Sequence, residues 1–139
     1  MSDQVILRVA TKIIVPTILL YALYVQFHGD FGPGGGFQAG VIFATGFILY
    51  AMVFGLEAAG KVITPGLLRV LMAVGVLMYA GVGFESLVLG GNFLEYRVLA
   101  DDPVGGQHLG IALIELGVGI TVAAVCIAVY YGFAGRVQE

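Results

Sequence analysis

Two carboxylates and two histidines lie inside or beside long apolar stretches of this 139-residue chain. Glu115 falls about seven residues into one apolar run, or roughly 11 Å along a helix, and Glu85 lies near the end of another. A carboxylate within a bilayer is costly and normally faces a partner or a wet cavity. His108 precedes Glu115 by two helical turns on the same face, and His28 ends the first apolar run. Since imidazole titrates near physiological pH, we predict these four residues as candidates for an ion path.

The same residues also have a structural explanation. Glu85 is close enough to the end of its run to remain solvated among lipid headgroups, and Glu115 can hydrogen-bond a neighbouring helix as packing glue. Histidines at the ends of apolar runs commonly belong to the membrane interface. The residue types alone leave both explanations open.

The composition indicates an integral membrane protein. Hydrophobic residues make up 60% of the chain and charged residues only 11%, whereas soluble domains carry about a quarter of their residues as charges. Six basic residues in a chain of net charge −3 exclude a nucleic-acid binder. The chain has one cysteine, no recognised catalytic or metal-ligand spacing and no phosphate-binding loop. We therefore expect no enzyme activity, no metal and no cofactor.

Four apolar segments are long enough to cross a membrane, since a spanning helix needs roughly 20 residues. They cover residues 5–27, 37–56, 67–89 and 108–133. We expect one all-α transmembrane domain over residues 1–139, in contact with membrane lipid. Five of the six basic residues lie on one side of this four-span arrangement and only Arg97 on the other. The positive-inside rule then predicts that both termini face the cytoplasm.

The connection between the first two spans is rich in glycine. It reads His28-Gly29-Asp30-Phe31-Gly32-Pro33-Gly34-Gly35-Gly36-Phe37-Gln38-Ala39-Gly40. Such a backbone has little helix tendency and accommodates positive φ angles. It is able to re-enter the membrane edge or approach a neighbouring backbone, or it forms a tight hairpin turn in which Gly36 and Gly40 make a helix-packing face.

This stretch resembles the signature of the MnhB-related subunits of Mrp-type multisubunit Na+/H+ antiporters. The matching residues are Pro33, Gly34, Gly35, Gly36, Phe37 and Gly40. The family often has Gly-His before the proline and a Gly-Gly pair after the phenylalanine, whereas this chain has His28-Gly29 and Ala39. The resemblance covers essentially the whole chain.

The resemblance implies a small subunit of a hetero-oligomeric complex in the bacterial cytoplasmic (inner) membrane that exchanges Na+ for protons. Its expected partners include large subunits similar to the proton-pumping subunits of respiratory complex I. The resemblance further implies a subunit needed for assembly or activity, with a place along the ion path as a further role.

Two other functions stay open at this stage. The same subunit type occurs as a module of membrane-bound hydrogenases and similar respiratory complexes, and nothing inside the chain separates that function from an antiporter. A self-contained homo-oligomeric ion channel is the third possibility, and it predicts ion flux from the isolated protein.

Overall fold

The computed structural model describes residues 2–29 and 31–136, so Asp30 of the glycine-rich stretch lies outside it. The elements are α1 (Ser2–His28), α2 (Gly36–Phe54), α3 (Leu56–Val62), α4 (Pro65–Val88), the 3-10 helix η1 (Tyr96–Leu99) and α5 (Pro103–Arg136). Helices α1, α2, α4 and α5 are long and apolar enough to cross a membrane. The predicted all-helical fold with four spans is therefore confirmed.

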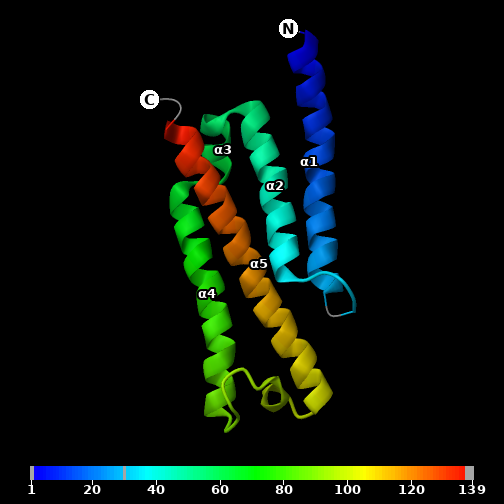
Figure 1. The fold of residues 1–139 in the computed structure, drawn as a ribbon, viewed down its shortest axis with the longest axis vertical. Coiled ribbons are helices and arrows are strands. Elements are labelled where there is room, and N and C mark those ends of the chain that lie inside the picture. The colour runs from blue at the N-terminus through cyan, green and yellow to red at the C-terminus, as the bar shows by residue number, and fades with distance from the viewer. Residues whose placement is uncertain (1, 30, 137–139) are drawn as a thin grey trace.

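The four long helices lie side by side in a row (Figure 1). Helix α5 packs between α4 and α2, and α2 packs between α5 and α1. Both ends of the described chain lie at the same end of the bundle, together with α3, while η1 lies at the opposite end (Figure 1). Two antiparallel hairpins, α1–α2 and α4–α5, thus make up the molecule.

Helix boundaries differ from the predicted spans where local capping decides them. Helix α2 ends at Phe54, within the predicted span 37–56, because Gly55 takes a φ of 92° and breaks the helix, and α3 follows it. Helix α5 already starts at Pro103, before the predicted span 108–133. Asp102 Oδ2 accepts a hydrogen bond from the Gly105 amide at 3.1 Å. An acidic cap followed by proline is a favoured helix start.

The two hairpins are staggered along the bundle axis. The α1–α2 connection lies part of the way along α5, whereas the connection that contains η1 lies beyond the ends of α4 and α5 (Figure 1). The α1–α2 and α4–α5 connections therefore occupy different levels. The middle of α5 becomes the neighbour of the glycine-rich turn.

Small residues allow α4 and α5 to approach closely. A methyl group placed on Gly75 of α4 would lie 2.6 Å from the Gly117 carbonyl oxygen and 3.0 Å from the Thr121 amide nitrogen. Ordinary carbon contacts are 3.5–4.0 Å, so any side chain at position 75 must push the helices apart. Close contact at small residues is the usual basis of helix association in membranes.

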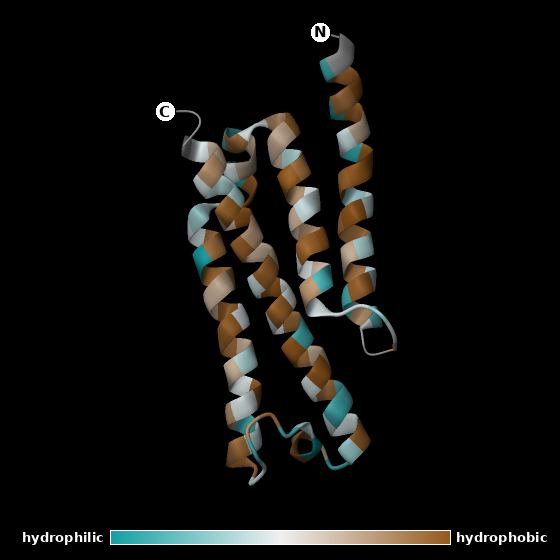
Figure 2. Ribbon diagram, viewed as in Figure 1, coloured by the Kyte–Doolittle hydropathy of each residue, from teal (hydrophilic) through white to brown (hydrophobic). Residues whose placement is uncertain are grey.

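Hydrophobic residues make up most of the length of each long helix (Figure 2). The main buried cluster lies toward the α3 end and includes Phe47, Leu68 and Ile127. At the same end the Tyr131 hydroxyl donates a hydrogen bond to the Ile63 carbonyl at 3.0 Å. The helices thus offer large apolar faces to lipid or to other subunits.

Replacing Gly75 with leucine should destabilise the bundle more than replacing Gly81, which lies on the same helix with nothing within 4 Å of an added methyl group. Both changes gain similar helix propensity, so the difference reports the α4–α5 contact. We expect Gly75→Leu to cost about 1–3 kcal/mol relative to Gly81→Leu. Thermal unfolding in mild detergent, followed by circular dichroism, measures this, and equal melting temperatures would refute the contact.

Candidate functional site: Glu115 beneath the glycine-rich turn

Glu115 lies on α5, twelve residues after Pro103, which places it about 18 Å from the start of that helix. Its side chain is half-buried. The neighbouring residues Ile114 and Leu116 are apolar, and the helix around it has the highest mean hydropathy of the four spans. The carboxylate therefore sits well inside an apolar element and not at its end.

The turn between α1 and α2 is folded back onto α1 by backbone hydrogen bonds. The Phe31 and Gly32 amides donate to the His28 carbonyl at 3.0 and 3.2 Å, and the Gly35 amide donates to the Val25 carbonyl at 3.2 Å. Gly35 has a φ of 118°, which L side chains rarely adopt. This conformation caps α2 and aligns the turn against α5.

The turn encloses the Glu115 carboxylate. A methyl group on Gly29 would lie 2.7 Å from Glu115 Oε2 and 2.8 Å from Oε1, and one on Gly35 would lie 2.9 Å from Oε1. On Gly36 it would overlap the Glu115 carbonyl oxygen and lie 2.7 Å from the carbonyl carbon. Backbone atoms occupy the space of a side chain at Gly36 and at Gly29, where the Gly35 Cα would lie 2.7 Å from the added methyl group. Gly35 is favoured by its φ of 118°.

The same close approach continues one turn along both helices. A methyl group on Gly40 of α2 would lie 2.7 Å from the Gly119 carbonyl oxygen and 2.9 Å from Val122 Cβ. A methyl group on Gly119 would lie 2.6 Å from Gln26 Oε1 and 3.2 Å from the Gly36 carbonyl oxygen. Gly36 and Gly40 therefore both lie against α5, so the Gly-x-x-x-Gly pair of the sequence faces a neighbouring helix.

Three other motif residues, Pro33, Gly34 and Phe37, lie in or beside the turn but are not among its contacts with the Glu115 carboxylate. A methyl group on Gly34 would lie 2.9 Å from the Val25 carbonyl oxygen, so Gly34 packs on α1. Pro33 and Phe37 are exposed. The His28 ring stacks on Tyr24, with centroids 5.3 Å apart and an interplanar angle of 16°.

The two remaining ion-path candidates, His108 and Glu85, lie farther toward the η1 end of the bundle. The His108 side chain is exposed, two turns before Glu115 on α5. Glu85 is exposed on α4. Because the Tyr79 amide lies at the level of Gly117, Glu85 stands about 9 Å beyond that level along α4. The structure thus joins Glu115 to the glycine-rich motif and leaves Glu85 apart from them.

Sequence reasoning missed three contact residues of this site. Gly29 touches the carboxylate, and Gly119 and Gln26 meet one turn away. Two signals were available in the sequence. Gly119 follows Glu115 by four residues and therefore lies on the same helix face, and Gln26 is a glutamine inside an otherwise apolar span. No group of three or more His, Cys, Asp or Glu residues able to hold a metal ion occurs within residues 2–29 and 31–136.

The arrangement suits a group that exchanges a small cation or a proton. A carboxylate offers two oxygen atoms, and in an apolar helix it gains stability from whatever neutralises it. The glycine backbone of the turn approaches the carboxylate without the bulk of side chains. The site therefore sets one carboxylate against a closely fitted glycine backbone.

Replacing Gly36 with alanine should separate the turn from α5, because the new methyl group overlaps the Glu115 backbone. Gly132→Ala is the matched control, since an added methyl group there has nothing within 4 Å. We expect Gly36→Ala to lower stability by about 1–3 kcal/mol, measured by thermal unfolding in detergent, while the control stays unchanged or gains slightly. A Gly36→Ala protein as stable as the control would show that the turn does not contact Glu115.

Comparison with known proteins agrees with this assignment of the motif. Residues 6–128 match the family model described as a domain related to the MnhB subunit of Na+/H+ antiporter. Proteins named "Putative antiporter subunit mnhB2" from Staphylococcus aureus strains Newman and JH1 are each 35% identical over 137 residues, covering 96% of both chains. The four-span chain with a glycine-rich turn on Glu115 belongs to the family of domains related to the MnhB subunit of Na+/H+ antiporters.

Proposed function

We propose that this chain is a small membrane subunit of a multisubunit Na+/H+ antiporter and that Glu115 serves the passage of the transported cation or proton. The observation that carries the proposal is the enclosure of the Glu115 carboxylate by Gly29, Gly35 and Gly36. The family match and the four apolar spans support the subunit role. The chain acts as a transport component and catalyses no reaction of its own.

The chemistry follows from the cost of a carboxylate among apolar helices. Such a group is retained where it meets a partner, a proton or a cation, and intramembrane carboxylates mark ion pathways for this reason. Glu115 gains and loses its neutralising cation as the complex works. The glycine turn lies close to both carboxylate oxygen atoms, and H+ and Na+ are the small ions that the proposed antiport would bring to them.

The arrangement of charges supports the expected orientation. Arg8, Lys12, Lys61 and Arg69 lie toward the α3 end of the bundle, and Arg97 belongs to η1 at the other end (Figure 1). By the positive-inside rule, the α3 end and both termini face the cytoplasm of a bacterial cell, and η1 faces outward. In this orientation, ions reach Glu115 from the outer half of the membrane.

Large apolar faces support assembly with other subunits. Apolar side chains such as Ile6, Ile13 and Leu20 are exposed along the length of α1. Only 11% of the most apolar 18-residue stretch of this helix is buried. We propose that complex-I-like large subunits cover part of this surface and carry the main ion conduction. The small subunit completes the outer part of their ion path.

Replacing Glu115 with glutamine tests the ion role, since it removes the ionisable group and nearly keeps the shape. We expect Na+/H+ antiport by the complex in inverted vesicles to fall by at least about ten-fold, since positioned proton-transfer groups contribute factors of about 10²–10⁴. Glu57→Gln is the control, because Glu57 is exposed on α3, away from the glycine-rich turn, and this change should leave transport unchanged. Wild-type transport by a fully assembled Glu115→Gln complex would make the carboxylate structural.

A pull-down of the tagged chain from mild-detergent membranes tests the subunit role separately. We expect complex-I-like antiporter subunits to be identified by mass among the proteins recovered. Hydrogenase subunits in their place would assign the chain to a respiratory complex. Recovery of a homo-oligomer alone, with ion flux in liposomes, would support a channel and contradict the proposal.

A further inference from the structure

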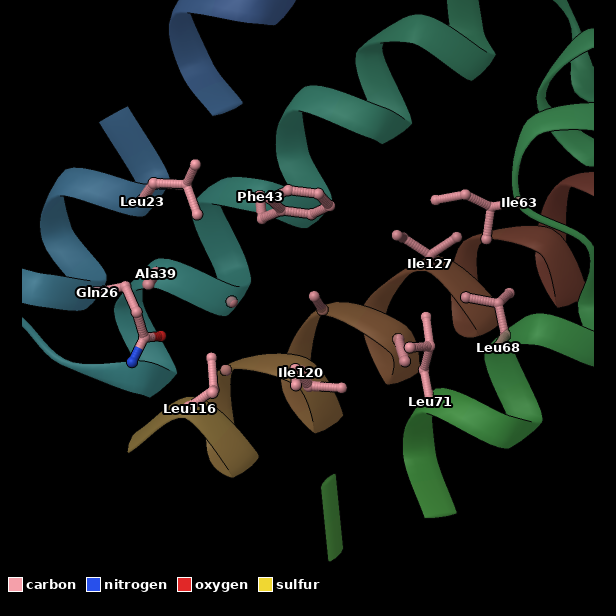
Figure 3. Close-up of a pocket in the computed structure, with 15 residues that line it drawn as sticks. Leu23, Gln26, Ala39, Phe43, Ile63, Leu68, Leu71, Leu116, Ile120 and Ile127 are labelled. Carbon is pink, nitrogen blue, oxygen red and sulfur yellow. The ribbon is translucent and has the colours of Figure 1, made fainter. Parts of the chain in front are cut away.

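An apolar groove runs along one face of α5, between α1 and α2 on one side and α4 on the other (Figure 3). We call it the α5 groove; its volume is about 250 Å³. It extends along α5 from Leu116 to Ile127, which is about three helical turns or 16 Å. Its floor contains the small residues Ala39, Gly40, Gly119 and Ala123.

Gln26 is the one polar side chain among the described residues that line the α5 groove. It belongs to the last turns of α1 and is only 9% exposed. Its side chain extends from α1 toward Leu116 at one end of the groove (Figure 3). Within residues 2–29 and 31–136 the Gln26 amide makes no hydrogen bond, although it lines the groove.

A side-chain amide that is nine-tenths buried without a hydrogen bond is unfavourable. Leaving such a group unpaired in an apolar environment costs roughly 1–3 kcal/mol by protein mutational data. Among the described residues no fully enclosed side-chain nitrogen or oxygen lacks a partner, so the remaining exposed area of the amide must be reachable from the groove. Water is scarce among apolar helices in a bilayer. A hydrogen-bonding group of another molecule that enters the groove would remove this cost.

We propose that the α5 groove is the docking site for one transmembrane helix of a neighbouring subunit, which presents a hydrogen-bonding side chain to the Gln26 amide. This inference rests on the proposed function as a subunit of a larger complex, and it names the surface that the partner occupies. The partner helix is apolar over about three turns and has a polar residue, such as Ser, Thr, Asn or Gln, at the level of Gln26.

The amide of Gln26 favours a helix over a lipid chain. Hydrogen bonds between polar side chains are a usual part of the contacts between helices in membranes. An acyl chain fills apolar space but has no group to pair with an amide. Phe43, Leu71 and Ile120 supply the walls against which apolar side chains of the partner pack.

Photo-crosslinking in the assembled complex tests the proposal. A benzophenone amino acid replaces Phe43, which lines the groove, and in a second protein it replaces Phe37, which is exposed on the same helix outside the groove. The chain is co-expressed with the other subunits of its complex and irradiated in native membranes. We expect the Phe43 position to cross-link to a transmembrane segment of one partner subunit, identified by mass.

The role of Gln26 is tested in the same assay with Gln26→Leu. We expect this substitution to lower the Phe43 cross-linking yield by about three-fold or more, the effect of losing one interhelical hydrogen bond. The Phe37 yield should not change. Gln38→Leu is the control, because Gln38 lies exposed on α2, and it should change neither yield.

The outcomes separate this inference from the proposed function. If partner subunits co-purify but Phe43 cross-links only to lipid, to a second copy of the chain or to nothing, the inference is overturned while the subunit role stands. An unchanged Phe43 yield in Gln26→Leu overturns the hydrogen bond. If no partner co-purifies at all, the proposed function itself fails.

Discussion

The backbone-to-backbone contact between Gly36 and Glu115 is the constraint on which the rest of the molecule depends. Any side chain at position 36 would occupy the space of the Glu115 carbonyl group, so α2 can begin there only as glycine. This contact fixes the α1–α2 hairpin about 18 Å along α5 from its start and produces the stagger of the two hairpins (Figure 1). The stagger in turn places Gly29 and Gly35 over the Glu115 carboxylate.

A carboxylate inside an apolar helix is energetically costly, and such groups commonly belong to ion pathways in transport proteins. The glycine turn lies against Glu115, while exposed apolar faces and the α5 groove remain elsewhere on the chain. Gln26 of α1 meets Gly119 of α5, and Gly119 lies one helical turn after Glu115 on α5. We infer that the docking site of the partner helix at Gln26 is adjacent to the ion path at Glu115 in the complex.

Hydropathy alone was enough to predict the helical fold, because four runs of this length and composition have few alternatives in a membrane. The capping pair Asp102-Pro103 also signalled the true start of α5, although the apolar pattern favoured a later one. The level at which the glycine turn meets α5 could not be predicted. It depends on which backbone surfaces fit together, and a single sequence shows that glycines permit close approach without showing what approaches them. Gln26 escaped notice because one amide in an apolar span has no local pattern.

Solid-state NMR of the protein in lipid bilayers tests the central contact most directly. Glutamate labelled with carbon-13 at the carboxyl and glycine labelled at Cα are combined in a Glu95→Gln background, because Glu95 also lies beside a glycine, Gly91. Glu115 Cδ lies 3.5 Å from the methyl position of Gly35, so its distance to the glycine Cα is at most about 5 Å, given a carbon–carbon bond of about 1.5 Å. We predict a carboxyl–glycine cross-peak that disappears in Glu115→Gln. Absence of the cross-peak, or its persistence after that substitution, would contradict the enclosure of Glu115 by the turn.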